Sequence, residues 1–109
     1  MNIENILNTH FHLLNPIQRE KRKKDLENIE DSLSYIDSYR FKFKSFRGGG
    51  PIGTYIVKYI SDEEKWSTIT PKNIEDAENR LRSFGFENST THYPKRGKVY
   101  IDIKITTLL

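Results

Sequence analysis

The chain has 109 residues and a formal net charge of +3, with 35% hydrophobic and 12% aromatic residues and no cysteine. This length fits one domain, and the aromatic content argues against a disordered chain. The absence of cysteine excludes disulfides, thiolate catalysis and thiolate metal sites, and the mild positive charge permits an anionic partner without requiring one.

Helical periodicity dominates residues 1–38. Apolar residues recur at helical spacing over residues 3–14, which predicts a short amphipathic helix. Asn15 is then a good N-cap and Pro16 a favoured first helical residue, so a second helix is predicted from Pro16 to Ser38. One apolar stripe of this helix, predicted to face the sheet or the first helix, consists of Leu26, Ile29, Leu33 and Ile36.

Strand patterns begin near residue 39. Aromatic and basic residues alternate from Tyr39 to Phe46, which predicts a first strand. The glycine-rich segment 47–53 cannot continue a strand and is predicted to be a loop. Thr54 to Ile60 is rich in β-branched and aromatic residues, and we expect it to pair with the first strand as an antiparallel hairpin.

The C-terminal part contains the most sharply bounded elements. Residues 70–71, Thr-Pro, are a capping signal for a third helix, and Gly85 is a suitable residue to end it. Phe86 to Tyr93 is a weaker strand prediction, followed by a tight turn at 94–97. Lys98 to Ile105 is the clearest strand, because isoleucine and valine alternate with polar or aromatic residues throughout.

Together these patterns predict a single α+β domain over residues 1–109. A helical part, residues 1–38, precedes a ββαββ part, residues 39–109. The apolar faces of the strands need a cover, and the amphipathic helices can supply it. We therefore expect a four-stranded, mainly antiparallel sheet with helices packed on one face, and the pattern leaves the strand order open.

Basic residues gather in two places that are candidates for binding an anionic partner. In the second helix they crowd the first half, where each charge is disfavoured by the helix dipole by about 0.3–1 kcal/mol. A partner can explain this arrangement, and a solvated helix face is the alternative. On the first strand, basic residues share a face that Lys58, Tyr55 and Tyr59 can join, which suits nucleic acid. Lysines that protect an edge strand are the alternative there. The predicted binding residues, two of them from the last hairpin, are Arg19, Lys21, Arg22, Lys23, Lys24, Arg40, Lys42, Lys44, Arg47, Lys95 and Arg96.

Three further features carry weaker chemical signals. The glycine-rich loop 47–53 can present backbone N–H groups to an anion, but it matches neither a P-loop nor a dinucleotide fingerprint, so a flexible hairpin loop is the alternative. His92 lies among cations of the last hairpin and can be pictured as the general base of an RNase, or simply as part of an exposed turn. His10 and His12 do not share a helix face, which makes them a poor metal pair.

No catalytic, metal or cofactor motif is found, so we expect a non-enzymatic, cytoplasmic protein without cofactor or membrane association. The layout, a basic helical N-terminus followed by a compact sheet, is similar to that of some small phage-encoded inhibitors of CRISPR nucleases. The sequence favours a binding module that engages nucleic acid, or the nucleic-acid-binding groove of a partner such as a host nuclease or CRISPR effector. The alternatives are a small metal-independent RNase-like toxin centred on His92, and an assembly subunit that associates through the apolar stripe of the second helix.

Overall fold

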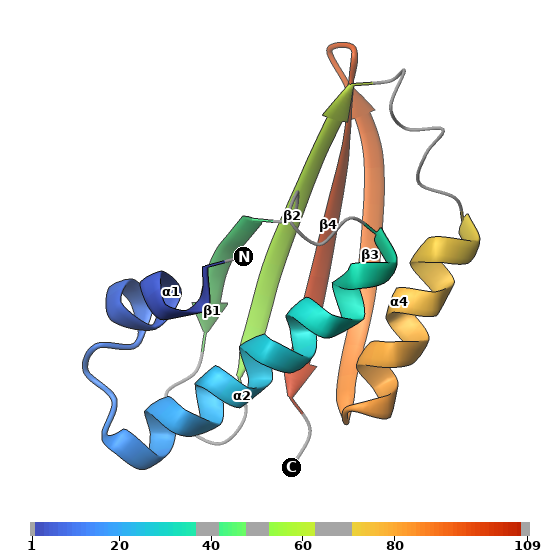
Figure 1. The fold of residues 1–109 in the computed structure, drawn as a ribbon. Helices are drawn as coiled ribbons and strands as arrows, with labels where there is room; N and C mark the ends of the chain where they lie inside the picture. The colour runs from blue at the N-terminus through green and yellow to red at the C-terminus, as the bar shows by residue number, and fades with distance from the viewer. Residues whose placement is uncertain (1, 37–41, 48–52, 63–70, 108–109) are drawn as a thin grey trace.

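The computed structural model describes residues 2–36, 42–47, 53–62 and 71–107 (Figure 1). Helices lie on one side of an antiparallel sheet, which confirms the predicted α+β class. In chain order the elements are α1 (Ile3–His10), α2 (Pro16–Leu33), the 3-10 turn η1 (Ser34–Ile36), β1 (Lys42–Arg47), β2 (Thr54–Asp62), α4 (Pro71–Ser83), β3 (Phe86–Lys95) and β4 (Lys98–Thr107).

Local capping explains where the second helix begins. The Asn15 side chain accepts a hydrogen bond from the Gln18 backbone N–H at 2.9 Å, and the Gln18 side chain accepts one from the Asn15 N–H at 3.3 Å. With Pro16 at the first position, this capping box confirms the predicted start. The α-helix gives way to a 3-10 turn after Leu33, and the end predicted at Ser38 lies outside the described residues.

The first helix is shorter than the predicted 3–14. It ends at His10, and Phe11 leaves the helical region with φ −126° and ψ 19°. The Phe11 N–H still donates to the Leu7 carbonyl, and the Leu14 N–H donates to the Phe11 carbonyl, so the chain turns at once. The turn is needed because Asn15, which precedes a proline, is extended and cannot continue a helix.

The strands lie in the order β1-β2-β4-β3, and each neighbouring pair is antiparallel. β2 and β4 are therefore the inner strands. β3 and β4 are joined by a two-residue turn, Arg96-Gly97, in which both residues have positive φ, 52° and 75°. Positive φ at both central residues is the backbone conformation of a type I′ turn, which suits two-residue hairpins. The turn is shorter than the predicted 94–97, because β3 extends to Lys95 instead of ending at Tyr93, while β4 begins at Lys98 as predicted.

One core lies between the helices and the sheet. The stripe residues of α2, among them Leu26 and Ile29, are fully buried, and so is Tyr55 of β2. Each aliphatic side chain buried this way contributes about 1.5–3 kcal/mol. Because the apolar stripe of α2 is buried in the core of its own chain, it is not exposed as the interface that an assembly subunit was expected to use.

The opposite side of the sheet is crossed by none of the helices that the structure describes (Figure 1). Alternate residues of each strand point to this side, and every one of those described is partly or fully exposed. We call this surface the open face, and its described residues are Thr54, Ile56, Lys58, Glu87, Ser89, Thr91, Lys98, Tyr100, Asp102, Lys104 and Thr106.

Candidate binding surface

Arg22, expected among the exposed basic residues, is buried between α2 and β2. Its side chain is 3% exposed, and its Nη1 donates to Asp25 Oδ2 and to the Tyr55 hydroxyl, each at 3.3 Å. The Tyr55 hydroxyl donates to the same Asp25 oxygen at 2.7 Å. Burial, and then the bond to Asp25, raise the pKa of Tyr55 well above its ordinary value. These bonds connect α2 to β2, and burial keeps the Arg22 side chain away from any partner at the surface.

Two further cations of α2 are bound by α1. Arg19 donates to Asn8 Oδ1 at 2.8 Å and lies 3.4 Å from Glu4 Oε2, while Lys23 Nζ lies 3.9 Å from Glu4 Oε1. These groups are partly exposed, so each ion pair is worth about 0–1 kcal/mol at most. The pairs nevertheless give a structural reason for the cations that oppose the helix dipole. In the same helix Lys21 and Lys24 are exposed.

The basic residues predicted on the first strand are described only by backbone pairing. Lys42 lies opposite Lys58, and Arg47 lies opposite Thr54. The register shifts between Phe43 and Ser45, so the strict alternation expected through Lys44 is interrupted. Arg40 lies outside the described residues, as do residues 48–52 of the glycine-rich loop, whereas Arg47, predicted to begin that loop, is the last residue of β1.

Tyr55 and Tyr59 are not on the face proposed for them. Both are buried in the core, because they share the side of β2 that carries Val57. The aromatic residue that the structure does place among exposed cations is Tyr100 of β4, which the sequence pattern put on the polar side of its strand and among the cations of the last hairpin.

Tyr100 lies on the open face of the inner strand β4, near the β3–β4 turn. The Lys58 ammonium is 5.2 Å from the centroid of its ring, a cation–π contact between the two inner strands. Lys98 and Lys104, two and four residues away along β4, are exposed on the same face. Among the described residues, none of these three lysines forms an ion pair with a carboxylate.

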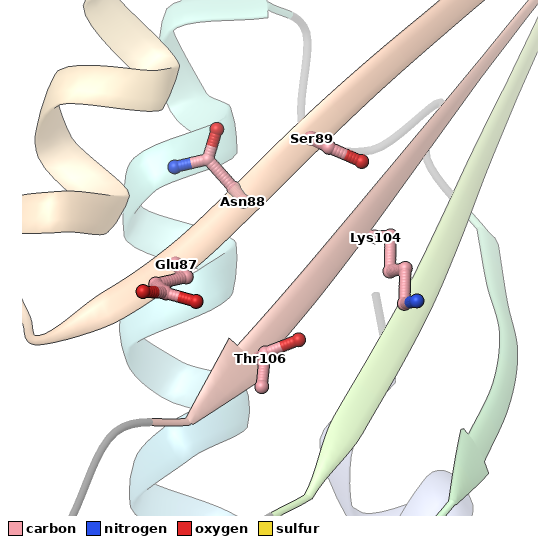
Figure 2. Close-up of a pocket in the computed structure, with 5 residues that line it drawn as sticks. All are labelled: Glu87, Asn88, Ser89, Lys104 and Thr106. Atoms are coloured by element: carbon pink, nitrogen blue, oxygen red, sulfur yellow. The ribbon is translucent and has the colours of Figure 1, made fainter.

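A shallow hollow lies beside this cluster. It measures about 190 Å³ and is lined by Glu87, Asn88, Ser89, Lys104 and Thr106. Figure 2 shows Asn88 turned towards the helices, while Lys104 and Thr106 stand on the open side of β4. The Asn88 amide donates to the Glu78 carbonyl of α4 at 3.3 Å, which ties β3 to that helix. The hollow therefore extends the open face towards the edge strand β3.

The last hairpin does not assemble the expected RNase constellation. His92 lies opposite Ile101, a core residue, and so belongs to the helix side of the sheet. Lys98 and Tyr100 belong to the open face. Arg96 is exposed at the tip of the hairpin, and Lys95, placed by its backbone alone, lies opposite Lys98. Nor do three histidine or carboxylate side chains gather as metal ligands anywhere among the described residues.

Comparison with known proteins gives no relative from which a function of this surface could be proposed. No protein-family model matches the chain, and no match is found among curated proteins or solved structures. In the described part of the chain, every helix is too short or too polar to cross a bilayer.

Proposed function

We propose that this protein is a non-enzymatic module that binds single-stranded nucleic acid on the open face of its sheet. The observation that carries the proposal is the group formed by Tyr100 with Lys58, Lys98 and Lys104, which lies on the two inner strands and lacks carboxylate ion pairs in the described chain. Proteins that bind single strands combine an aromatic stacking platform with cations for the phosphates, and a sheet face can supply both.

The spacing of the group suits a short stretch of single strand. Side chains two residues apart on one strand are separated by about 7 Å, so Lys98 and Tyr100 are neighbours and Lys104 lies about 13 Å beyond Tyr100. A single-stranded nucleic acid that runs along β4 can place one base on the Tyr100 ring and its phosphates near Lys98 and Lys104. Because the Lys58 ammonium is held by a ring rather than by a carboxylate, its N–H donors remain able to reach a phosphate.

The test is a fluorescence polarisation titration of single-stranded RNA and DNA at several salt concentrations. Tyr100→Ala should weaken binding about tenfold, the usual contribution of one stacked base. Lys104→Ala should weaken binding and reduce the slope of log affinity against log salt by about 0.7, as expected for one lost phosphate contact.

Lys24→Ala is the matched control, because Lys24 is an exposed lysine of α2 that also forms no ion pair with the described residues. It lies in the helical layer, so we expect its affinity to stay within about twofold of the natural protein. Equal losses in Lys24→Ala and Lys104→Ala would show diffuse charge attraction rather than binding on the open face. An absence of binding at low salt would overturn the proposal.

A second candidate function is inhibition of a nuclease through protein contact. It is favoured by two large apolar side chains that lie outside the core, Leu13 at 88% exposure and Ile17 at 84%. Both lie where α1 turns into α2, and the exposed Lys21 follows one turn later. Apolar side chains beside a cation suit a protein groove with an acidic rim. Inhibition of CRISPR nucleases in a cleavage assay, lost in Leu13→Ser/Ile17→Ser, would support this function. Inhibition that survives the double substitution would remove it.

A further inference from the structure

The hollow beside Lys104 contains a carboxylate and an ammonium that do not pair with each other. Glu87 of β3 lies opposite Thr106 of β4, and Ser89 lies opposite Lys104, so the four residues form two neighbouring cross-strand pairs. Glu87, Ser89 and Lys104 are exposed. Residues on the diagonal of such a group are about 7–8 Å apart, and Figure 2 shows the charged ends of Glu87 and Lys104 well separated. Within the described chain neither of them forms an ion pair.

The Glu87 carboxylate receives no hydrogen bond from the residues that the structure describes. An ionised carboxylate only accepts hydrogen bonds, so a ligand must bring a donor to satisfy it. The backbone of DNA has none, because its phosphodiester groups and deoxyriboses carry no N–H or O–H within the chain. The 2′-hydroxyl of RNA is such a donor, and every ribonucleotide carries one. The backbone of RNA can therefore satisfy Glu87, and that of DNA cannot.

The charges in the hollow make this donor important. The Glu87 carboxylate repels the phosphates of RNA and DNA alike. In RNA a hydrogen bond from the 2′-hydroxyl offsets that repulsion, whereas nothing in the DNA backbone does. Each 2′-hydroxyl lies beside the 3′-phosphate of its own nucleotide, so a phosphate bound by Lys104 brings a hydroxyl into the same hollow. The volume of this hollow, about 190 Å³, is sufficient for one ribose.

We infer that Glu87 makes the open face selective for RNA over DNA, by accepting a hydrogen bond from a 2′-hydroxyl while Lys104 binds the adjacent phosphate. Ser89 and Thr106 line the same hollow, and their hydroxyls can donate to that phosphate. The hollow is further along β4 than Tyr100, so it receives a different nucleotide from the one whose base stacks on the ring. The inference rests on the proposed function, since it names the class of nucleic acid that the same surface prefers.

The experiment compares three oligonucleotides of one sequence by fluorescence polarisation: RNA, 2′-fluoro RNA, and DNA with deoxyuridine in place of thymidine. RNA should bind about tenfold more tightly than either of the others, which is the lower end of the range for one hydrogen bond to a charged group. The 2′-fluoro sugar keeps the pucker of ribose but has no hydroxyl proton, so it should bind like DNA. In Glu87→Ala the RNA and DNA affinities should agree within about twofold, because no carboxylate remains to accept the 2′-hydroxyl.

Glu27→Ala is the matched control, because Glu27 is an exposed carboxylate of α2 that likewise forms no ion pair with the described residues. Both substitutions remove one negative charge, so both should strengthen the binding of RNA and of DNA. Only Glu87→Ala should lower the ratio of RNA to DNA affinity. An equal fall of this ratio in both variants would assign the preference to net charge and overturn the role of Glu87.

The outcomes also separate this inference from the proposed function. Salt-dependent binding that requires Tyr100, but is equal for RNA and DNA or for RNA and its 2′-fluoro form, would overturn recognition of the hydroxyl and leave the binding module intact. A lack of binding to all three oligonucleotides would overturn both. A second substitution, Glu87→Val, suits an edge strand and provides no acceptor, so it should also lose the preference. Circular dichroism melts of both variants should match that of the natural protein, since Glu87 is exposed.

Discussion

Replacing Arg22 with methionine separates the structural role of this residue from the partner contact that its sequence context suggests. The substitution removes the hydrogen bonds that this buried charge donates to Asp25 and to Tyr55. Breaking a fully buried ion pair costs about 3–5 kcal/mol. Here Asp25 keeps its 2.7 Å bond from Tyr55 and is 15% exposed, and methionine replaces part of the arginine stem. We therefore expect a loss of about 2–3 kcal/mol in the free energy of unfolding.

Urea denaturation followed by far-ultraviolet circular dichroism measures this loss, and a melt should show a decrease of about 10–15 °C in Tm. The control is Lys24→Met, which removes an exposed cation from the same helix and should change the free energy of unfolding by less than about 0.5 kcal/mol. Nucleic-acid affinity at a temperature where both variants are folded should be unaffected by Arg22→Met. A variant as stable as the control, with weakened binding, would contradict the network and make Arg22 a contact residue.

Further expectations concern single positions. The pKa of Tyr55 is raised above its ordinary 10.0, so above about pH 10 the folded chain keeps a proton that the unfolded chain releases. The free energy of unfolding that depends on the Tyr55 hydroxyl is therefore intact below about pH 10 and falls as the pH rises further. Tyr55→Phe should flatten that fall, measured by denaturation at about pH 8 and pH 11; an unchanged pH dependence would contradict it. Arg96→Asn should raise the urea midpoint through a gain of about 0.5–1 kcal/mol, since asparagine tolerates the φ of 52° at this turn position better than arginine does; a lowered midpoint would refute the argument. Ile17→Ser should alter stability by less than about 0.5 kcal/mol, because its side chain is 84% exposed, and a larger loss in a melt would show that it packs.

The elements that the sequence predicts well are those with local causes. The start of α2 depends on Asn15, Pro16 and Gln18, which are close neighbours in the chain. The end of α4 depends on Gly85, whose φ of 90° suits glycine, and its N–H donates to the Arg82 carbonyl. β4 is defined by its own alternation, which puts Ile101 in the core and Tyr100 on the other side. None of these requires knowledge of a distant partner.

The burial of Arg22 could have been predicted from its spacing in the helix, but the charged residues next to it in the sequence suggested a solvated face. It stands in the run Arg-Glu-Lys-Arg-Lys-Lys, where every charge looks like part of a solvated face. Its spacing says otherwise, since Arg22, Leu26 and Ile29 follow one another at four and three residues on a single helical stripe. What no pattern supplies is the partner on β2, because Tyr55 is distant in sequence and its position depends on the strand order.

The strand order also decides which cations can act together. Pairing β2 with β4 brings Lys58 beside Tyr100, although 42 positions separate them in the chain. Predicting the binding cations from their density in the sequence pointed to α2, where the fold uses Arg19 and Lys23 to hold α1. Density identifies where positive charge is plentiful, whereas availability depends on which carboxylates the fold brings within reach.

Charge balance on the open face determines the kind of recognition it can support. The lysines around Tyr100 share this face with the carboxylates of Asp102 and Glu87, so the described surface has little net positive charge. Phosphate attraction alone would then give weak binding that fades quickly with salt. A ligand must gain most of its affinity from stacking and from hydrogen bonds at fixed positions, and both depend on the identity of the base. If the open face binds single-stranded nucleic acid as proposed, it should therefore discriminate between base sequences more than it binds polyanions in general.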